Sequence, residues 1–465
     1  MAQPSNIEVL NRYKVAPPEG SVPPTSLPLS FFDFPWLPAI PMKRLFFYYH
    51  PYPTHHFIQT VIPTLKTSLS LTLQHFFPFA ANLIFPSKPQ IPHILYVHGD
   101  SVEFTVAEST ADFTHLTADY SKDVKDLRPL VPELPSARDL DDGSRAVPLI
   151  AIQVTILPCH GFSIGVIFHH VAADGRAFHH LIKSWASICR TGGFLEEPEP
   201  IHERVGIEDT HGLEKIFLNQ WWDLTNWESK QVQDKKPNLD IYNDFVKATI
   251  KLGQAQIHNL KNWVSKEYKN ELAMTHTSTF VVICSLIWVC LLESQSTVIS
   301  YRGNEDEDKL CYFIFSADCR NRYGFSIPTS YFGNCLAFCF VSLNLNELVG
   351  ELGFVQAMKA IGSKIKELED GALKGAEKWM LSGKEIMELA YHVVIVGASP
   401  YFGVYKTDFG LGKLKKTEVV HVGEQGVISL ADSRDEEGGI EVGLALPKDQ
   451  MDNFNVIFRQ YLELK

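Results

Sequence analysis

The residues Phe168-His169-His170-Val171-Ala172-Ala173-Asp174-Gly175 set a histidine and an aspartate four positions apart, with a glycine after them. The stretch begins at the last residue of the apolar run Ile164–Phe168, and this run has the composition of a buried strand. A strand that ends there would present His170 at its mouth, with Asp174 turned back behind it. A neutral imidazole is well matched to removing a proton from a hydroxyl near pH 7. The stretch therefore predicts His170 as a general base.

The same residues allow two simpler interpretations. A histidine at the end of a strand is often only packed, and Asp174 could merely cap the helix that follows. His169, His179 and His180 lie close by and could bind a metal ion. No ExxH or CxxC spacing accompanies them, so we expect no metal site.

The composition indicates a globular chain. At 465 residues, with 45% hydrophobic and 21% charged residues, the chain predicts two domains of about 200 residues each. A net charge of −12 and the absence of a basic stripe argue against a nucleic-acid partner. A coenzyme A substrate would have to find local lysines or backbone amides for its phosphates, because the overall field repels them.

Cysteine spacing and apolar runs indicate a reducing, cytoplasmic setting. None of the eight cysteines is paired at zinc or redox-motif spacing. The start, Met1–Asn11, is polar and lacks the apolar core of a signal peptide. The longest apolar run, Thr279–Leu292, is too short for a bilayer and predicts a buried helix. Five cysteines lie in apolar stretches and are predicted to be buried thiols: Cys159, Cys284, Cys290, Cys311 and Cys339.

The pattern of strands and helices is mixed α/β without a regular βαβ cadence. Between 191 and 239 the pattern fails, which predicts a crossover between a domain at 1–190 and a domain at 240–465. Strands are predicted at Arg44–Tyr49, His93–Val97, Val102–Ala107, Pro148–Leu157, Gly161–Phe168, Phe245–Leu252, Cys311–Ser316, Ala337–Leu343, Val393–Val396, Glu418–Val422 and Ile440–Leu446. Helices are predicted at Phe57–Phe76, Arg176–Arg190, Ala255–Ser265, Thr279–Leu292, Leu348–Leu368 and Lys448–Leu462.

Gly161-Phe162-Ser163-Ile164-Gly165 matches the GxSxG pattern of serine hydrolases. That chemistry needs a sharp strand-to-helix turn that exposes the serine hydroxyl. These glycines instead follow a turn and lead into more strand. We therefore expect Ser163 to be an ordinary strand residue, and a serine hydrolase remains only an alternative.

Two further segments, Tyr331-Phe332-Gly333-Asn334-Cys335 and Asp408-Phe409-Gly410-Leu411-Gly412, are not explained by propensity. Together with the His170–Gly175 stretch, in this order and spacing, they resemble the plant BAHD acyl-CoA-dependent acyltransferases. The resemblance covers the whole chain and includes Leu29-Ser30-Phe31-Phe32-Asp33 and Asp318-Cys319-Arg320-Asn321-Arg322. The YFGNC segment resembles the anthocyanin and flavonoid-glycoside branch.

The resemblance implies an α/β fold of two chloramphenicol-acetyltransferase-like domains joined by a crossover loop. A channel at the domain interface would reach His170 from both sides, with acyl-CoA entering by one face and the glycoside by the other. Asp174 would pair with Arg320 and, with Gly175, support the loop. Asp408 and Gly410 would be structural, although some descriptions of the family call the aspartate catalytic, so Asp408 stays a catalytic candidate.

The resemblance also implies substrate-binding positions. Thr277 and Ser278, at the start of the predicted buried helix, match a family position near the pantetheine or acyl group. Tyr331 and Asn334 of the YFGNC segment are the other candidates. Leu411 replaces the tryptophan usual in this family, which leaves catalysis unaffected if the segment is structural.

The predicted activity is acyl transfer from CoA to a sugar hydroxyl of an anthocyanin or other flavonoid glycoside. Leu411 and the segments Leu73–Pro78 and Phe104–Thr110 resemble members of this branch that use hydroxycinnamoyl donors, so the resemblance implies such a donor in preference to malonyl-CoA. We expect a cytoplasmic monomer that needs no cofactor beyond acyl-CoA as co-substrate. A malonyltransferase and a non-catalytic protein that binds a small molecule remain alternatives.

Overall fold

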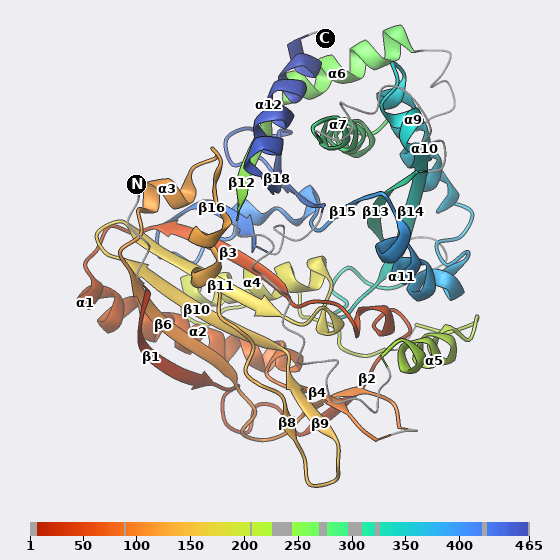
Figure 1. Cartoon of the computed structure of the whole chain (residues 1–465). Helices are drawn as coiled ribbons and strands as arrows, with labels where there is room; N and C mark the ends of the chain where they lie inside the picture. Colours follow the sequence, from red (N-terminus) through yellow and green to blue (C-terminus); the bar gives the residue numbers. More distant parts are fainter. Residues whose placement is uncertain are drawn as a thin grey trace.

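The computed structural model describes residues 7–87, 90–204, 207–225, 244–268, 277–295, 309–320, 326–420 and 426–463. Within these ranges the chain forms three sheets with helices packed on them, a mixed α/β architecture as predicted. Figure 1 shows the two larger sheets side by side, with the N-terminal strands in one and most of the C-terminal strands in the other.

The first sheet carries the strand that leads to His170. Its order is β1-β6-β10-β11-β3-β16. The predicted strand pair is confirmed, because β10 and β11 are antiparallel with Ile150 opposite Phe168. Every residue of both strands is buried, which explains their continuous apolar sequences. The strands are β1 (Ile7–Val15), β6 (Val102–Ser109), β10 (Ile150–Leu157), β11 (Gly161–Phe168), β3 (Met42–Tyr49) and β16 (Lys413–Val419).

Helices α2 (Ile62–His75) and α4 (Gly175–Thr191) pack against each other beside this sheet. The indole nitrogen of Trp185 in α4 donates a hydrogen bond to the carbonyl of Leu65 in α2 at 3.1 Å. The predicted helix at Phe57–Phe76 is interrupted at its start, where Phe57–Val61 forms a π-helical turn before Pro63.

The second sheet has the order β14-β13-β15-β17-β18-β12-β7. Its strands are β14 (Leu336–Asn344), β13 (Leu310–Asp318), β15 (His392–Val396), β17 (Val427–Asp432), β18 (Ile440–Pro447), β12 (Phe245–Leu252) and β7 (Lys122–Asp123). Helix α7 (Thr279–Glu293) packs between α10 (Gly353–Glu367) and α12 (Lys448–Glu463), and every residue from Val281 to Leu292 is buried. This burial confirms the predicted buried helix and explains why it is apolar on all faces.

The remaining elements lie around these two sheets. The third sheet has the order β2-β5-β4-β9-β8, with β2 (Thr25–Pro28), β5 (His93–Tyr96), β4 (Asn82–Phe85), β9 (Arg145–Pro148) and β8 (Arg138–Asp139). The other helices are α1 (Thr54–His56), α3 (Phe113–Thr117), α5 (Leu213–Thr225), α6 (Gln254–Glu267), α9 (Leu345–Leu348) and α11 (Trp379–Leu389). In the described part of the chain, no helix is both long and apolar enough to cross a bilayer.

Two strands join the sheet of the other half of the chain. β16 pairs with β3 in the first sheet, although it lies late in the sequence. β7 pairs with β12 in the second sheet, although it lies early. The halves are therefore interlocked by hydrogen bonds. The domain boundaries at 190 and 240 stay a prediction.

Three sequence-based expectations need correction. The helix predicted at Leu348–Leu368 begins only at Gly353, as α10, because the chain turns at Gly350 after the short helix α9 ends at Leu348. The crossover at 191–239 is not wholly irregular, since it contains α5, while residues 226–239 lie outside the described ranges. Cys159 is exposed in the β10–β11 turn with a φ of 64°, although all eight cysteines are free thiols as expected.

Candidate active site

His170 lies just past the end of β11, in the short 3-10 turn His170–Ala172. The amide of His169 still bonds to the carbonyl of Leu149 at 2.8 Å, and the chain then leaves the sheet through this turn into α4. The His170 side chain is buried, with 8% of its surface exposed. Burial lowers the pKa of His170 to about 4, so the imidazole is neutral at pH 7.

Asn334 fixes which nitrogen of His170 carries the proton. The amide nitrogen of Asn334 donates to Oδ1 of Asp33 at 2.9 Å and to the carbonyl oxygens of His170 at 2.9 Å and Val171 at 3.2 Å. These acceptors assign the orientation of the amide, so its Oδ1 faces Nδ1 of His170 at 3.0 Å. Nδ1–H therefore donates to Asn334, and Nε2 carries the lone pair.

Nε2 of His170 has no hydrogen-bond partner among the residues that the structure describes. The ring is held in place by two contacts, the bond from Nδ1 to Asn334 and a stacked contact with Trp36. The indole and imidazole centroids are 3.6 Å apart, with an interplanar angle of 10°. A neutral imidazole with a fixed tautomer and a free Nε2 has the form required of a general base.

Asp33 connects the LSFFD segment to this arrangement. Its side chain is fully buried and accepts hydrogen bonds at Oδ2 from the amide and hydroxyl of Ser30, both at 2.8 Å. Its Oδ1 accepts from the amide and the side chain of Asn334. Arg204 lies 3.6 Å from Oδ2 and supplies the opposite charge. The chain Asp33–Asn334–His170 therefore joins residues that are 301 and 164 positions apart.

Asp174 caps α4 and points away from the imidazole. Its Oδ1 accepts from the amide of Ala177 at 3.0 Å, and its Oδ2 accepts from Arg320 at 2.7 Å and from the amide of Cys335 at 3.1 Å. The predicted pair of Asp174 with Arg320 is present and fully buried. Burial opposes the charge of Arg320, but Asp174 and Asp318 outweigh it and raise the pKa of the guanidinium.

Arg320 also holds the YFGNC segment. Its Nη2 donates to the carbonyl oxygens of Tyr331 at 3.2 Å and Gly333 at 3.0 Å. Gly175 is required by a close approach, because a Cβ there would lie 2.5 Å from the ring of Phe402. Asp174, Gly175 and Arg320 therefore position the turn that carries His170.

Tyr331 and Asn334 are placed differently from the sequence-based expectation of substrate contact. Tyr331 is 2% exposed, and its hydroxyl accepts a hydrogen bond from Arg204. Asn334 is fully buried, and its amide group is bonded to Asp33 and to the His170 turn. Because their polar atoms are used inside the protein, both residues position the site instead of presenting a surface to a substrate.

Asp408 and Gly410 lie at the other end of α4. Oδ1 of the exposed Asp408 accepts from the amide of Gly410 at 2.8 Å, and a Cβ on Gly410 would lie 3.2 Å from Arg190. The helix between Gly175 and Arg190 is about 22 Å long. Direct catalysis by Asp408 does not fit this position, which corrects that candidate role. Gly410 has a φ of +69°, which favours glycine.

Thr277 and Ser278 stand at the N-terminus of α7. Ser278 caps the helix, with its hydroxyl accepting from the amide of Val281 at 3.3 Å, and Thr277 is exposed. Their contact with CoA stays a prediction.

Ser163 is a fully buried strand residue paired with Thr155 and Phe47. A hydroxyl in the middle of a sheet cannot act as the exposed nucleophile of a hydrolase, so that alternative is wrong. In the described ranges, no three histidine, cysteine or acidic side chains are grouped to hold a metal ion.

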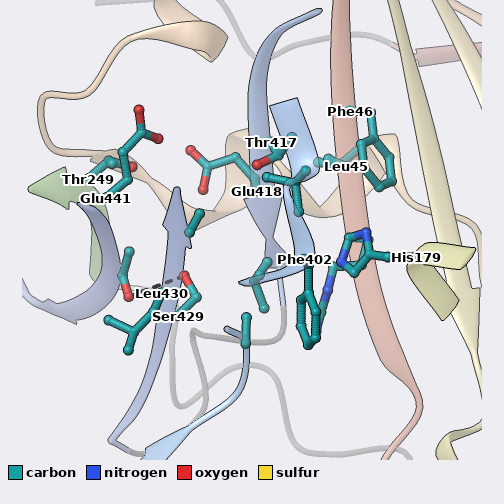
Figure 2. A pocket seen from close by; sticks show the side chains of 16 residues that line it. Leu45, Phe46, His179, Thr249, Phe402, Thr417, Glu418, Ser429, Leu430 and Glu441 are labelled. Carbon is teal, nitrogen blue, oxygen red and sulfur yellow. Dashed lines mark hydrogen bonds between the residues drawn. The ribbon is translucent and has the colours of Figure 1, made fainter. Parts of the chain in front are cut away.

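A small cavity lies between the two large sheets, and His170 is not among the residues that line it. Figure 2 shows Phe46 and His179 on one side of it and Thr249, Ser429 and Glu441 on the other. Arg44 also lines this cavity, and its charge contributes to the low pKa of His170 after burial. A channel that reaches His170 from both faces stays a prediction.

Four contributors to the site were not assigned from the sequence: Asp33, Trp36, Arg44 and Arg204. Asp33 belongs to the LSFFD segment, and a carboxylate that follows such an apolar stretch is expected to be buried and paired. Trp36, Arg44 and Arg204 gave no such signal, since each meets its partners only in the folded chain.

Comparisons with known proteins cover almost the whole chain. The family model described as the Transferase family matches residues 5–460. Coumaroyl-CoA:anthocyanidin 3-O-glucoside-6''-O-coumaroyltransferase 1 of Arabidopsis thaliana is 39% identical over 97% of each chain. Malonyl-coenzyme A:anthocyanin 3-O-glucoside-6''-O-malonyltransferase of Dahlia pinnata is 36% identical over 98% of each chain.

Solved structures share the fold at low identity. Vinorine synthase superposes with a TM-score of 0.69 at 18% identity, and the match covers 98% of each chain. The TRI101 protein of F. sporotrichioides, complexed with coenzyme A and T-2, gives a TM-score of 0.60 at 14% identity. That match covers 93% of this chain and 97% of the other. At these identities the likeness establishes the fold alone, and it confirms the predicted fold class.

Proposed function

The chain belongs to the Transferase family of BAHD acyltransferases, and from that premise we propose that it moves an acyl group from CoA to a sugar hydroxyl of an anthocyanin or other flavonoid glycoside. The observation that carries the proposal is the neutral, buried His170, whose Nδ1–H is held by Asn334 and whose Nε2 is free to accept a proton. The coumaroyl- and malonyltransferases of anthocyanin glucosides among its relatives support this substrate class.

We favour a hydroxycinnamoyl donor. Trp36 and Phe338 place aromatic surface beside His170, with their centroids 4.8 Å apart, and a flat aromatic acyl chain packs well on such rings. Arg44 supports a malonyl donor as the second candidate, because its guanidinium lies near enough to His170 to affect its pKa and could face a carboxylate.

The proposed mechanism is direct transfer in a ternary complex. Nε2 of His170 removes the proton from the sugar hydroxyl while the oxygen attacks the thioester carbonyl. The tetrahedral intermediate then breaks its C–S bond, and the histidinium returns the proton to the departing CoA sulfur. General-base help of this kind contributes about 10²–10⁴-fold, so positioning of both substrates must supply much of the remainder.

No covalent acyl-enzyme is needed, and we propose that the enzyme uses no cofactor besides its CoA co-substrate. We further propose that it acts as a monomer in the cytoplasm. Asp174 has no part in proton transfer in this mechanism, because both of its oxygens are occupied by Ala177, Arg320 and Cys335.

The test is a donor and acceptor panel with the purified protein. Malonyl-, acetyl-, coumaroyl- and caffeoyl-CoA are each incubated with cyanidin and flavonol glucosides, and CoA release and product mass are measured. We expect coumaroyl or caffeoyl products on the sugar, and their loss by at least about 10²-fold in His170→Ala with the fold retained. No CoA release with any donor would favour a non-catalytic binding protein and reject the proposal.

A further inference from the structure

The indole of Trp36 stacks on the imidazole of His170, the proposed base. The two rings are nearly parallel, with centroids 3.6 Å apart and an angle of 10°. The residue ends the short 3-10 turn Phe34–Trp36, which follows Asp33. The same turn therefore supplies the carboxylate that orients Asn334 and the ring that stacks on His170.

The indole nitrogen of Trp36 is buried, yet it has no hydrogen-bond acceptor among the described residues. Buried polar groups in folded proteins are nearly always paired, and an unpaired donor at a reactive site calls for an explanation. The backbone of Trp36, in contrast, is fully hydrogen-bonded. Its amide donates to the carbonyl of Asp33 and its carbonyl accepts from the amide of Ala39, both at 3.1 Å. The unpaired donor is thus carried by a firmly held residue.

The other donor next to His170 is already engaged. The amide of Asn334 donates to Asp33, His170 and Val171. Trp36 also contacts Phe338, whose ring centroid lies 4.8 Å from that of the indole. A fixed donor that costs no reorganisation is the kind of group that stabilises charge developing in a transition state.

We propose that Trp36 is a further catalytic residue, whose Nε1–H donates a hydrogen bond to the oxyanion formed when the thioester is attacked. The inference rests on the proposed acyl transfer. A hydroxyl bonded to Nε2 lies in the imidazole plane, and a carbonyl ready for attack lies about 3–3.5 Å from that oxygen. This spacing is similar to the separation of the two stacked rings, so a carbonyl on the indole side of the imidazole plane would lie in the layer of the indole.

The step balances without any further reactant. The sugar oxygen forms a bond to the acyl carbon as its proton passes to Nε2 of His170, and the carbonyl π electrons move to oxygen. Nε1–H of Trp36 stabilises that oxyanion, and the stacked indole face lies against the histidinium formed at the same time. Collapse restores the carbonyl, breaks the C–S bond and sends the proton to sulfur.

The first test is Trp36→Phe, which keeps an aromatic ring beside His170 but removes the N–H together with part of the bicyclic ring. We expect kcat to fall about 10²-fold, with KM for both substrates within about twofold, because the donor acts in the transition state. Trp379→Phe is the matched control, since Trp379 packs on the far partner Phe338 with centroids 5.4 Å apart. It should retain kcat within about twofold.

The second test changes the acceptor atom. A dithioester analogue of the acyl-CoA carries C=S in place of C=O, and sulfur accepts hydrogen bonds weakly. With this donor, wild type and Trp36→Phe should differ by less than about threefold, whereas a merely structural role would slow both donors equally. Equal slowing with the two donors, or a normal kcat of Trp36→Phe with the ordinary thioester, overturns the inference, while wild-type turnover keeps the proposed function. Absence of wild-type turnover overturns both.

Discussion

At the scale of single residues, the chemistry depends on which nitrogen of His170 is free. Asn334 accepts from Nδ1–H because its amide group is turned toward Asp33 and the His170 turn. The Nε2 lone pair is therefore available without a carboxylate bonded to the imidazole. The proposed base is a neutral histidine held by an amide side chain, and burial keeps it unprotonated.

The pH dependence of the reaction follows from that burial. The protonated imidazole cannot act as a base, and a pKa of about 4 for His170 keeps the neutral form populated at mildly acidic pH. We expect kcat/KM to hold from pH 7 down to about pH 5 and to fall near pH 4. An acid limb at pH 6 to 7 in the kcat/KM profile would contradict the assignment. Arg44 also lowers this pKa, so Arg44→Met should move the limb upward.

Removing Asn334 should disturb the tautomer more than substrate binding. In Asn334→Ala, Nδ1 loses its acceptor and the proton can move to Nε2, which removes the base. We expect kcat to fall on the order of 10²-fold with little change in KM. The control is Asn82→Ala, another buried asparagine, whose amide bonds to Asp100 at 3.0 Å away from the site. Equal kcat in the two variants would argue against the tautomer role.

At the scale of elements, α4 separates two aspartates that look equally important in the sequence. Asp174 caps its first turn inside the protein and pairs with Arg320. Asp408 closes an exposed turn beside its last residues. Phe409, the residue after Asp408, packs edge-on against Trp185 of α4, and the ring centroids are 5.0 Å apart. The DFGLG segment therefore packs on the helix and holds it in place.

These positions predict different consequences of the same substitution. Asp174→Ala removes the buried carboxylate that pairs with Arg320 and leaves it only that of the partly exposed Asp318 at 3.2 Å, and we expect the free energy of unfolding to fall by about 3 kcal/mol. Asp408→Ala removes one exposed hydrogen bond, from the amide of Gly410 to the carboxylate, so the free energy of unfolding should fall by about 1 kcal/mol or less. Thermal or urea unfolding measures both. The kcat of folded Asp408→Ala should stay within about threefold of wild type, and a loss beyond about 10²-fold would restore its catalytic candidacy.

At the scale of the whole molecule, the two large sheets are joined by exchanged strands and by a buried cluster of charges. Glu418 of β16 lies 3.5 Å from Lys122, 3.4 Å from Lys247 and 3.9 Å from Lys416, all of them buried. Burial opposes ionisation of Glu418, but the three lysines hold its pKa below the usual value. One carboxylate therefore stabilises cations from β7, β12 and β16.

Substitution of Glu418 should weaken the junction of the sheets. Glu418→Gln leaves three buried lysines without their common carboxylate, and we expect a loss of about 3 kcal/mol or more in unfolding free energy. Glu388→Gln is the control, since Glu388 makes an exposed pair with Lys384 and should change stability by less than about 1 kcal/mol. Calorimetry should show one unfolding transition for wild type, because neither sheet is complete without a strand of the other half. Equal stability of the two variants would contradict the role of the cluster.

Much of the fold was predictable because burial leaves a local pattern. The runs Ile150–Leu157 and Gly161–Phe168 are apolar throughout, and both proved to be fully buried strands. β1 and α5 were missed, because their exposed faces interrupt the apolar period. The exchange of β16 and β7 was also beyond prediction, since pairing partners hundreds of residues apart leave no local trace.

The sequence by itself determined the candidate base, the strand that leads to it and the family, because His170, Asp174 and the two later motifs stand in a fixed order along the chain. Only the tertiary structure decided what each residue does at the site. It turned Asn334 and Tyr331 inward, moved Asp408 to the far end of α4 and set Trp36 on the imidazole. The reason is physical: hydrogen bonds and ring contacts act over a few ångströms in space, and their partners here come from segments up to 301 residues apart.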